Sequence, residues 1–335
     1  MAKVQSFKIF CPSTGLGLKK DAKIIETTLR ELGFQVSVYT GQRFYRVISF
    51  LYIKVRLVKL SLRIKRFFNR DSNVVVIHLE RVSQKGLLVG GHNILVPNQE
   101  WCAKHVLSLL SYIDVIWCKS KLAVAIFSEL GYSTEYISFC TELDSSVMRN
   151  EVLINQEKGF FTRIGPSRNR GAEQLAKLWA KHSEWPILKM VVDPEYRPDT
   201  IAENIEYIGY IHSDEEFNCL ANSVPFHIFL TEAEGFGHLI VESMSRGAIV
   251  LMTNASPMNE YASQESAILM SAYYAGQLQL SPRFHVNDDV IEAAVEKALS
   301  LNSEAKFTIS KMAANINGEL IQKFREHLVH AISRL

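Results

Sequence analysis

One order of elements occurs near the start of the chain and again near its middle: a short apolar strand, a loop, a helix and a second strand. In the first copy, an apolar run at 7–12 leads into a glycine-containing loop at 13–17. A helical pattern follows and stops at Gly33, before a second apolar run at 36–39. Strand, helix and strand in this order form a βαβ unit, whose two strands lie parallel in one sheet. The chain is therefore expected to be an α/β protein.

The second copy spans 159–192, with its helix at 172–182. Continuous apolar runs are typical of parallel strands that are buried on both faces. Further runs of this kind lie at 74–78, 94–96, 205–208, 226–230 and 249–252. Two consecutive α/β domains are the simplest interpretation, with a boundary near 144–155.

A chain of 335 residues is long enough for two domains. We expect a first domain at 1–150, a second at 151–318 and a separate final helix at 319–335. Because an apolar stripe on a helix needs a partner surface, we expect this last helix to pack back across the first domain. Its stripe consists of Leu320, Phe324, Leu328 and Ile332.

The charge and cysteine content argue against several classes of protein. A net charge of +2 gives no support to a nucleic-acid binder, which usually carries a strongly basic balance. The five cysteines are scattered and never form Cys-x-x-Cys, so we expect neither a disulfide framework nor a zinc site. No apolar stretch reaches the ~18 residues of a membrane-spanning helix. We expect a cytoplasmic protein that is soluble or peripheral to a membrane.

The segment at 231–242 is the most informative part of the sequence. A predicted buried strand runs into a turn that contains Gly235 and Gly237, and a helix is expected to begin near His238. Open α/β sheets bind ligands at the carboxyl ends of their strands, and glycines let the backbone approach a ligand closely. A helix N-terminus favours phosphate, and carboxylates such as Glu234 and Glu242 accept hydrogen bonds from sugar hydroxyls.

This segment resembles the E-x7-E signature of glycosyltransferase family 4, written here as Glu234-Gly235-Phe236-Gly237 and Glu242. The flanking segments 208–210 and 242–250 are similar to that family as well. The resemblance implies the GT-B fold, with two Rossmann-like doubly wound domains facing a cleft, and a metal-independent transfer that retains the anomeric configuration. It also implies that Glu234 contacts the transferred sugar, that Glu242 binds the ribose, and that Phe236 and His238 belong to the donor site. The alternative is a helix start with solvent-exposed glutamates beside a glycine turn.

Arginines follow the first strand of the second domain, where the family has an arginine and a lysine that bind the donor diphosphate. Arg163 matches the arginine, while Arg168 or Arg170 takes the place of the lysine. Arg170 is preferred because Gly171 follows it, as glycine follows the family's lysine. A fixed cation near a leaving diphosphate stabilises its developing negative charge. The alternative is a loop of solvated arginines.

The motifs in the first domain are less specific. Gly15 and Gly17 stand where family members have a glycine loop that faces the donor phosphates, although the third glycine of a dinucleotide fingerprint is missing. The loop after the strand at 94–96 supplies Asn98 and Glu100 for acceptor hydroxyls and Trp101 for stacking on a sugar ring. An ordinary strand-end turn is the alternative.

His78 closes another predicted strand, where it resembles the strand-end histidines of the family. We consider it as an acceptor contact, with a satisfied core histidine as the other interpretation.

No cofactor is expected, because the nucleotide sugar is itself a substrate. The chain contains no Asp-x-Asp pair, which favours side-chain cations over a metal ion. A retaining transfer also needs no protein base, since the leaving phosphate can take the proton of the acceptor. The enzyme then has to position both substrates and stabilise charge.

Between Arg43 and Arg70 the sequence has nine basic residues and no acidic ones. A basic amphipathic helix is typical of a membrane-surface element. We therefore expect a lipid-linked or lipopolysaccharide-type glycan acceptor and binding to the anionic inner face of the cell membrane. The alternative is an apolar stripe packed on the sheet with solvated cations. The basic stripe consists of Arg56, Lys59, Arg63, Arg66 and Arg70.

The sequence thus predicts a hexosyltransferase-type enzyme of cell-surface polysaccharide or lipopolysaccharide synthesis. Two other hypotheses remain open. A sugar-nucleotide epimerase of the same fold binds the donor but has no use for a membrane helix. A non-catalytic partner or membrane-binding subunit has no need of both Glu234 and Glu242.

Overall fold

A computed structural model of the chain describes residues 4, 6–12, 15–41, 73–89, 91–142, 158–165 and 170–335, with only the backbone of 104 and 105. The predicted domain boundary near 144–155 and the basic segment, including Arg56, Lys59, Arg63 and Arg66, lie outside these residues. The contacts divide the chain into two compact units. Unit 1 comprises 1–142 and 321–335, and unit 2 comprises 143–320. Among the described helices, none is long and apolar enough to cross a membrane.

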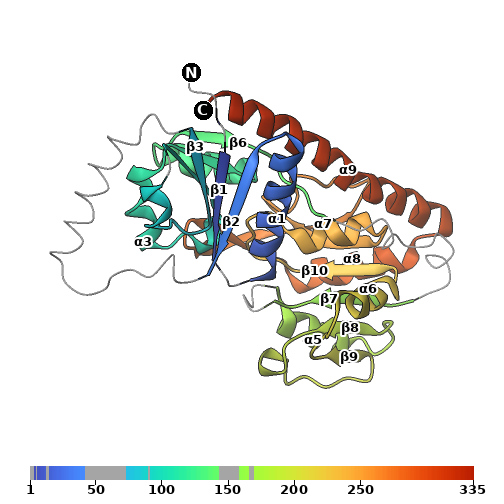
Figure 1. The fold of residues 1–335 in the computed structure, drawn as a ribbon. Coiled ribbons are helices and arrows are strands. Elements are labelled where there is room, and N and C mark those ends of the chain that lie inside the picture. The colour runs from blue at the N-terminus through green and yellow to red at the C-terminus, as the bar shows by residue number, and fades with distance from the viewer. Residues whose placement is uncertain are drawn as a thin grey trace. The chain divides into compact units, whose positions relative to one another are not determined.

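Unit 1 contains a six-stranded parallel sheet with the order β2-β1-β3-β4-β5-β6 (Figure 1). The chain returns to β3 beside β1, so the strand order reverses between these two strands. The strands are β1 (Ser6–Cys11), β2 (Gln35–Thr40), β3 (Val74–Leu79), β4 (His92–Val96), β5 (Val115–Cys118) and β6 (Thr134–Tyr136). The helices are α1 (Leu16–Glu31), α3 (Lys104–Leu107) and α4 (Lys121–Glu129), with short 3-10 turns at Gly86–Leu88, Gln99–Trp101 and Leu110–Tyr112.

Unit 2 contains a second parallel sheet of six strands, in the order β12-β11-β10-β7-β8-β9. In this sheet the order reverses between β7 and β10. The strands are β7 (Phe160–Arg163), β8 (Leu188–Val191), β9 (Ile205–Ile208), β10 (Phe226–Phe229), β11 (Ile249–Asn254) and β12 (Ile268–Ser271). An antiparallel hairpin of β13 (Tyr273–Leu278) and β14 (Ser281–His285) follows. The helices are α5 (Ala172–Lys181), α6 (Asp214–Asn222), α7 (His238–Ser245) and α8 (Asp288–Ser300), with a 3-10 turn at Pro194–Tyr196.

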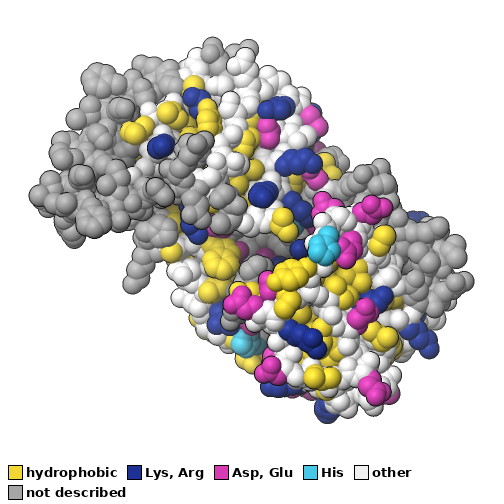
Figure 2. Space-filling model, turned by 60° about the horizontal axis from the view of Figure 1, so that its bottom comes forward, with side chains coloured by type: hydrophobic (Ala, Val, Ile, Leu, Met, Phe, Trp, Pro, Cys, Tyr) yellow, Lys and Arg dark blue, Asp and Glu magenta, His cyan; other side chains and the backbone are white. Residues whose placement is uncertain are grey.

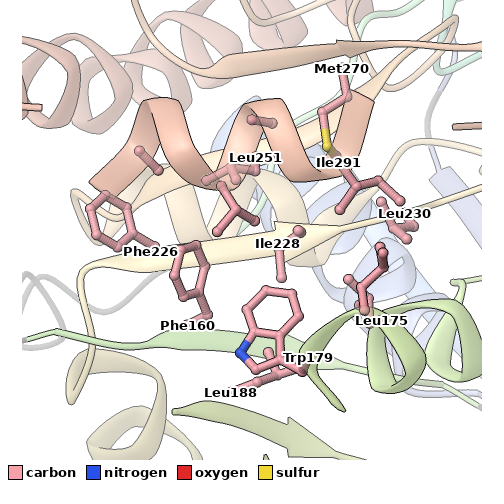
Figure 3. Packing of buried hydrophobic residues seen from close by; sticks show 14 of the residues in the cluster. Phe160, Leu175, Trp179, Leu188, Phe226, Ile228, Leu230, Leu251, Met270 and Ile291 are labelled. Carbon is pink, nitrogen blue, oxygen red and sulfur yellow. The ribbon is translucent and has the colours of Figure 1, made fainter. Parts of the chain in front are cut away.

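Helices cover both faces of the unit 2 sheet. Successive residues of a strand point to opposite faces, so each strand buries side chains on both sides. Phe226 and Ile228 face α5 and α8, whereas Phe229 faces α6 and α7 on the opposite side. Figure 3 shows the first of these layers, in which Trp179 of α5 lies against Phe160 with ring centroids 5.2 Å apart. This alternation explains why the strands appear in the sequence as continuous apolar runs, and it confirms the predicted α/β fold with two parallel sheets.

The last helix differs from its prediction. α9 runs from Ser303 to Ser333 and is continuous in Figure 1, so the expected start at Glu319 is wrong. Its first part buries Ser310 and Ala313 in unit 2. These side chains are too small or too polar to form an apolar stripe that the sequence would show. Its last part belongs to unit 1, where the ring of Phe324 lies 5.1 Å from that of Phe139.

Charges of both signs are mixed on the surface. On the face shown in Figure 2, basic and acidic side chains of the described residues alternate with apolar ones. This distribution agrees with the small net charge of +2.

Candidate functional site

The strand order of unit 2 places a ligand-binding position at the carboxyl ends of β7 and β10. In a doubly wound sheet, the two loops on either side of an order reversal diverge and leave room for a ligand between them. Arg163 ends β7 and Arg170 follows in its loop, whereas Glu234 follows β10. Arg170 and Glu234, which are 64 positions apart in the sequence, therefore meet at one edge of the sheet.

An ion pair joins the two loops. Arg170 Nη2 donates a hydrogen bond to Glu234 Oε1 at 2.5 Å, and Arg170 Nη1 donates to the carbonyl oxygen of Arg163 at 3.3 Å. The side chains of Arg170 and Glu234 are 17% and 18% exposed, so solvent still reaches both. The pair holds a cation and a carboxylate in place while both remain partly exposed.

Two further arginines flank a single aromatic ring beside this pair. The guanidinium of Arg163 lies 4.7 Å from the ring centroid of Phe217 on α6, and that of Arg246 lies 5.7 Å from it. Burial lowers the pKa of both arginines, and the negative charge of Glu242 opposes that shift in each case. Glu242 itself is buried on α7. The structure thus brings Arg163, Arg170, Glu234 and Glu242 into one charged cluster.

The turn between β10 and α7 has the backbone that its glycines predict. Gly237 is the residue before the helix and has φ 96°, in the region that favours glycine. A Cβ at this position would lie 2.6 Å from the hydroxyl oxygen of Tyr261, which also excludes a side chain. Phe236 is buried, and His238 begins the helix, whose first N–H groups have no acceptor within the helix. Gly235 is buried in the same turn.

Arg168 lies in the part of the β7–α5 loop that the structure does not describe. The choice between Arg168 and Arg170 as the substitute for the family's lysine therefore rests on the Arg170 contacts alone. These contacts direct Arg170 toward Glu234, as a role in the same site requires.

An open pocket of about 490 Å³ adjoins the same strand ends on the α5 side. Its wall is formed by the start of α5, the loop after β8 and strand β14. Glu232, which follows β10, lies in this wall and is paired with Arg283 of β14. The hairpin β13–β14 is thereby tied to the end of β10.

In unit 1, the predicted glycine loop is shorter than expected. Gly15 is the residue before α1 and has φ 95°, but Gly17 already lies in the first turn of the helix. Beyond the Cα of each glycine there is open space where a Cβ would stand. Gly15 therefore keeps the conformational role of a loop glycine, and Gly17 is a helical residue.

A buried polar network occupies the carboxyl edge of the unit 1 sheet. Lys119, which follows β5, donates to Asp21 of α1 at 2.7 Å and to the amide oxygen of Asn98 at 2.5 Å. The amide nitrogen of Asn98 donates to Glu80 at 3.2 Å. Lys119 and Asp21 have only 3% of their side chains exposed. Asn98 thus links a buried lysine to a buried glutamate at the edge where β3, β4 and β5 end.

Glu80 is unusual within this network. It has φ 59°, a left-handed conformation that is uncommon for a residue with a side chain and that concentrates at functional sites. Burial raises the pKa of Glu80, while Asn98, Arg81 and Lys119 oppose the rise.

The other predicted acceptor residues fall into two groups. Trp101 is 45% exposed, as a stacking residue requires, whereas Glu100 is buried. His78 is fully buried: its Nδ1 accepts from the backbone N–H of Ser83, and its Nε2 lies 3.2 Å from the Asn93 side-chain oxygen. Burial lowers the pKa of His78 to about 4, so the ring is neutral. These contacts favour a satisfied core histidine over an acceptor contact.

Solved structures with the same architecture cover nearly the whole chain. Sucrose-phosphate synthase from Thermosynechococcus elongatus matches with a TM-score of 0.69 at 12% identity, covering 98% of this chain and 98% of its own. A glycosyltransferase from Rickettsia africae gives a TM-score of 0.69 at 12% identity, with 100% and 99% covered. HepE from Anabaena, solved with UDP and glucose, gives 0.64 at 13% identity, with 99% and 100% covered. The chain has the GT-B fold.

This result confirms the predicted fold class of two Rossmann-like doubly wound domains. No protein-family model and no curated protein matches the sequence. At such low identities the likeness concerns the GT-B fold alone, and the activity has to be argued from the site.

Sequence reasoning missed Asp21, Glu80, Arg246 and Tyr261 in this GT-B chain. Asp21 is separated from its partner Lys119 by 98 positions, and no local pattern relates them. Glu80 offered a weak signal, because it directly follows a continuous apolar strand. Tyr261 offered none, since its loop after β11 is not glycine-rich and reaches the site only through the pairing of β10 with β11.

Among the described residues, no group of three or more histidine, cysteine, aspartate or glutamate side chains is placed to hold a metal ion. The cations found at the candidate site are arginine side chains, among them Arg163 and Arg170.

Proposed function

We propose that the chain is a retaining, metal-independent glycosyltransferase similar to family 4, which transfers a sugar from a nucleoside-diphosphate sugar. The observation that carries the proposal is the charged cluster of Arg163, Arg170, Glu234 and Glu242 at the order reversal of the unit 2 sheet. The similar structures support it, because one is named a sucrose-phosphate synthase, another a glycosyltransferase, and a third contains UDP and glucose.

Each group has a role that its chemistry supports. Arg163 and Arg170 bind the donor diphosphate and stabilise the charge that develops as it leaves. Glu242 accepts hydrogen bonds from the ribose hydroxyls, and Glu234 from the transferred sugar. The start of α7 supplies N–H groups and the positive end of the helix dipole to the phosphates.

Binding of the donor changes the ion pair between Arg170 and Glu234. The diphosphate carries negative charge and competes with Glu234 for the guanidinium of Arg170. The carboxylate of Glu234 is then released to bind sugar hydroxyls. The ion pair keeps both groups in position and only partly desolvated.

The acceptor side of the proposal rests on unit 1 and on the basic segment. Trp101 is exposed for stacking, and Asn98 and Glu80 lie at the strand ends that face ligands in this fold. We propose a glycan or lipid-linked acceptor, used in cell-surface polysaccharide or lipopolysaccharide synthesis. The basic stripe predicted at 56–66 is proposed to bind anionic lipid at the inner face of the membrane, in a protein that is otherwise cytoplasmic.

A thermal-shift panel with UDP, GDP, ADP, CMP and dTDP tests the donor site. A ligand at ~100 times its dissociation constant stabilises the fold by about 2.7 kcal/mol. One nucleotide should raise the Tm of the wild type, and Glu242→Ala should lose that response. Glu203→Ala, which removes an exposed glutamate of the same unit, is the matched control and should respond like the wild type.

The panel, together with an assay of nucleotide-sugar conversion, separates the competing hypotheses. A well-folded protein that responds to no nucleotide is a non-catalytic partner and not a transferase. A protein that binds a nucleotide sugar and converts it to its epimer, without any acceptor, is an epimerase.

Vesicle sedimentation tests the membrane proposal separately. The wild type should sediment with phosphatidylglycerol vesicles and stay in solution with phosphatidylcholine vesicles. Replacing Arg56, Lys59, Arg63 and Arg66 by glutamine should abolish the difference, because each basic residue near an anionic surface contributes about 1 kcal/mol. Equal sedimentation of wild type and variant would contradict a role for this stripe.

A further inference from the structure

The hydroxyl group of Tyr261 is buried and has no hydrogen-bond partner among the described residues. An unsatisfied buried polar group costs about 1–3 kcal/mol, and most buried side-chain polar atoms in folded proteins have a partner. Phenylalanine has the same shape without this cost. The hydroxyl therefore needs an explanation other than the stability of the structure described above.

Tyr261 lies directly against the β10–α7 turn. Its hydroxyl oxygen is 2.6 Å from the point where a Cβ of Gly237 would stand, and its ring centroid is 5.6 Å from that of Phe236. The loop that carries it follows β11, which pairs with β10 along the whole of that strand. The hydroxyl is thus held by neighbouring elements of the same sheet, beneath the turn that presents Glu234.

The protonation state of Tyr261 makes it a hydrogen-bond donor. Burial raises the pKa of Tyr261 well above its usual value, and the negative charges of Glu234 and Glu260 raise it further. Arg170 opposes the shift. Both members of the Arg170–Glu234 ion pair therefore lie within electrostatic range of a phenol that keeps its proton.

We propose that Tyr261 is a positioning residue of the donor site: when the donor diphosphate takes Arg170, the Tyr261 hydroxyl donates a hydrogen bond to the Glu234 carboxylate. The inference rests on the proposed function, because it assigns a partner to Glu234 in the donor-bound state. This hydrogen bond fixes the orientation of the Glu234 carboxylate toward the sugar hydroxyls.

Tyr261→Phe tests this assignment through two readouts with opposite signs. In the absence of ligand, the variant should have a Tm equal to or above that of the wild type, because it removes an unpartnered hydroxyl. With ligand, the extra affinity of a nucleotide sugar over its free nucleotide should fall by about tenfold or more, since a hydrogen bond to a charged group is lost. The affinity of the free nucleotide should fall less, because its diphosphate also takes Arg170 from Glu234 but it has no sugar for Glu234 to orient.

The probes are UDP, GDP and ADP, each compared with its own sugar conjugate: UDP-glucose, GDP-mannose and ADP-glucose. Tyr274→Phe is the matched control, because it removes the same hydroxyl from a side chain that is 62% exposed in the same unit. The double variant Glu234→Ala with Tyr261→Phe should lose no more affinity than Glu234→Ala alone, since Glu234→Ala already removes the acceptor of the Tyr261 hydrogen bond.

Two results would overturn the assignment while leaving the donor site intact. One is an affinity for a nucleotide sugar that is the same in the wild type and in Tyr261→Phe. The other is a clear fall in the ligand-free Tm of Tyr261→Phe, which would show that the hydroxyl already has a partner. A wild type that responds to none of the six probes overturns the proposed function, and the role of Tyr261 with it.

Discussion

The carboxyl edges of the two sheets hold their charged side chains in different ways. In unit 1, the charged groups are buried and satisfied by one another, through Lys119, Asp21, Asn98 and Glu80. In unit 2, Arg170 and Glu234 keep contact with solvent. A closed network fixes the positions of its members, whereas a partly solvated pair can exchange partners at small cost. Unit 1 therefore has a rigid edge, and unit 2 has an edge whose charged groups can change partners.

The largest expected effect comes from breaking the closed network. Lys119→Met leaves Asp21 as an uncompensated buried charge, so the free energy of unfolding should fall by about 3–5 kcal/mol. Chemical denaturation of wild type and variant measures the loss. Lys23→Met is the control, because Lys23 pairs with Glu142 at the surface of the same unit and should change stability little. Equal losses for the two variants would refute the distinction between buried and exposed pairs.

The next effect belongs to unit 2 and concerns activity. Arg170→Gln should reduce turnover of the nucleotide sugar by about 10²–10³-fold, as expected when one fixed group that stabilises developing charge is removed. Its unfolding free energy should stay close to that of the wild type, because solvent already reaches Glu234. Single-turnover assays and denaturation give the two values. A variant with normal turnover and low stability would reverse our view of this edge.

The third effect concerns the turn between β10 and α7 in unit 2. Gly237→Ala imposes a left-handed backbone on alanine and directs its Cβ at the Tyr261 hydroxyl, so stability should fall by about 1–3 kcal/mol. Adding Tyr261→Phe should restore part of the loss, since the contacting oxygen is gone while the backbone strain remains. The absence of any restoration in thermal or chemical unfolding would mean that strain alone selects glycine.

The smallest effect is a pH dependence in unit 1. Burial raises the pKa of Glu80 above its usual 4.5, so the folded state binds this proton more tightly than the unfolded chain. The contribution of Glu80 to stability therefore declines as pH rises from 4.5 through the raised value.

Glu80→Gln cannot ionise and should avoid this decline. Measured from pH 4.5 upward, its unfolding free energy relative to the wild type should rise as the pH increases. A constant difference across this range would place Glu80 in a more solvated setting than the structure shows.

The repeated pattern of strands and helices was readable from the sequence because both sheets are buried on two faces. Each strand is then a continuous apolar run, and the turn before α7 is marked by its glycines and glutamates. The neighbours of that turn were not readable. Tyr261 and Asp21 reach their sites through strand pairing and long-range packing, and neither has a local pattern that distinguishes it from any other tyrosine or aspartate.

The limits of α9 show a second reason for a missed prediction. Apolar spacing identified the part with Leu320, Phe324 and Leu328, whose side chains are large. The preceding part buries Ser310 and Ala313, so its inward face has little hydrophobic contrast. Periodicity detects a helix only where the buried side chains differ clearly from the exposed ones.

Unit 1 is built from two separate segments of the chain, and this affects how it folds during synthesis on the ribosome. Its sheet is encoded by the first 142 residues, yet the aromatic contact between Phe139 and Phe324 and the ion pair between Glu135 and Arg334 await the end of α9. Domains usually fold in the order in which they are made. Here unit 2 has all of its residues before unit 1 does, so the half of the molecule that is translated first is the last to be completed.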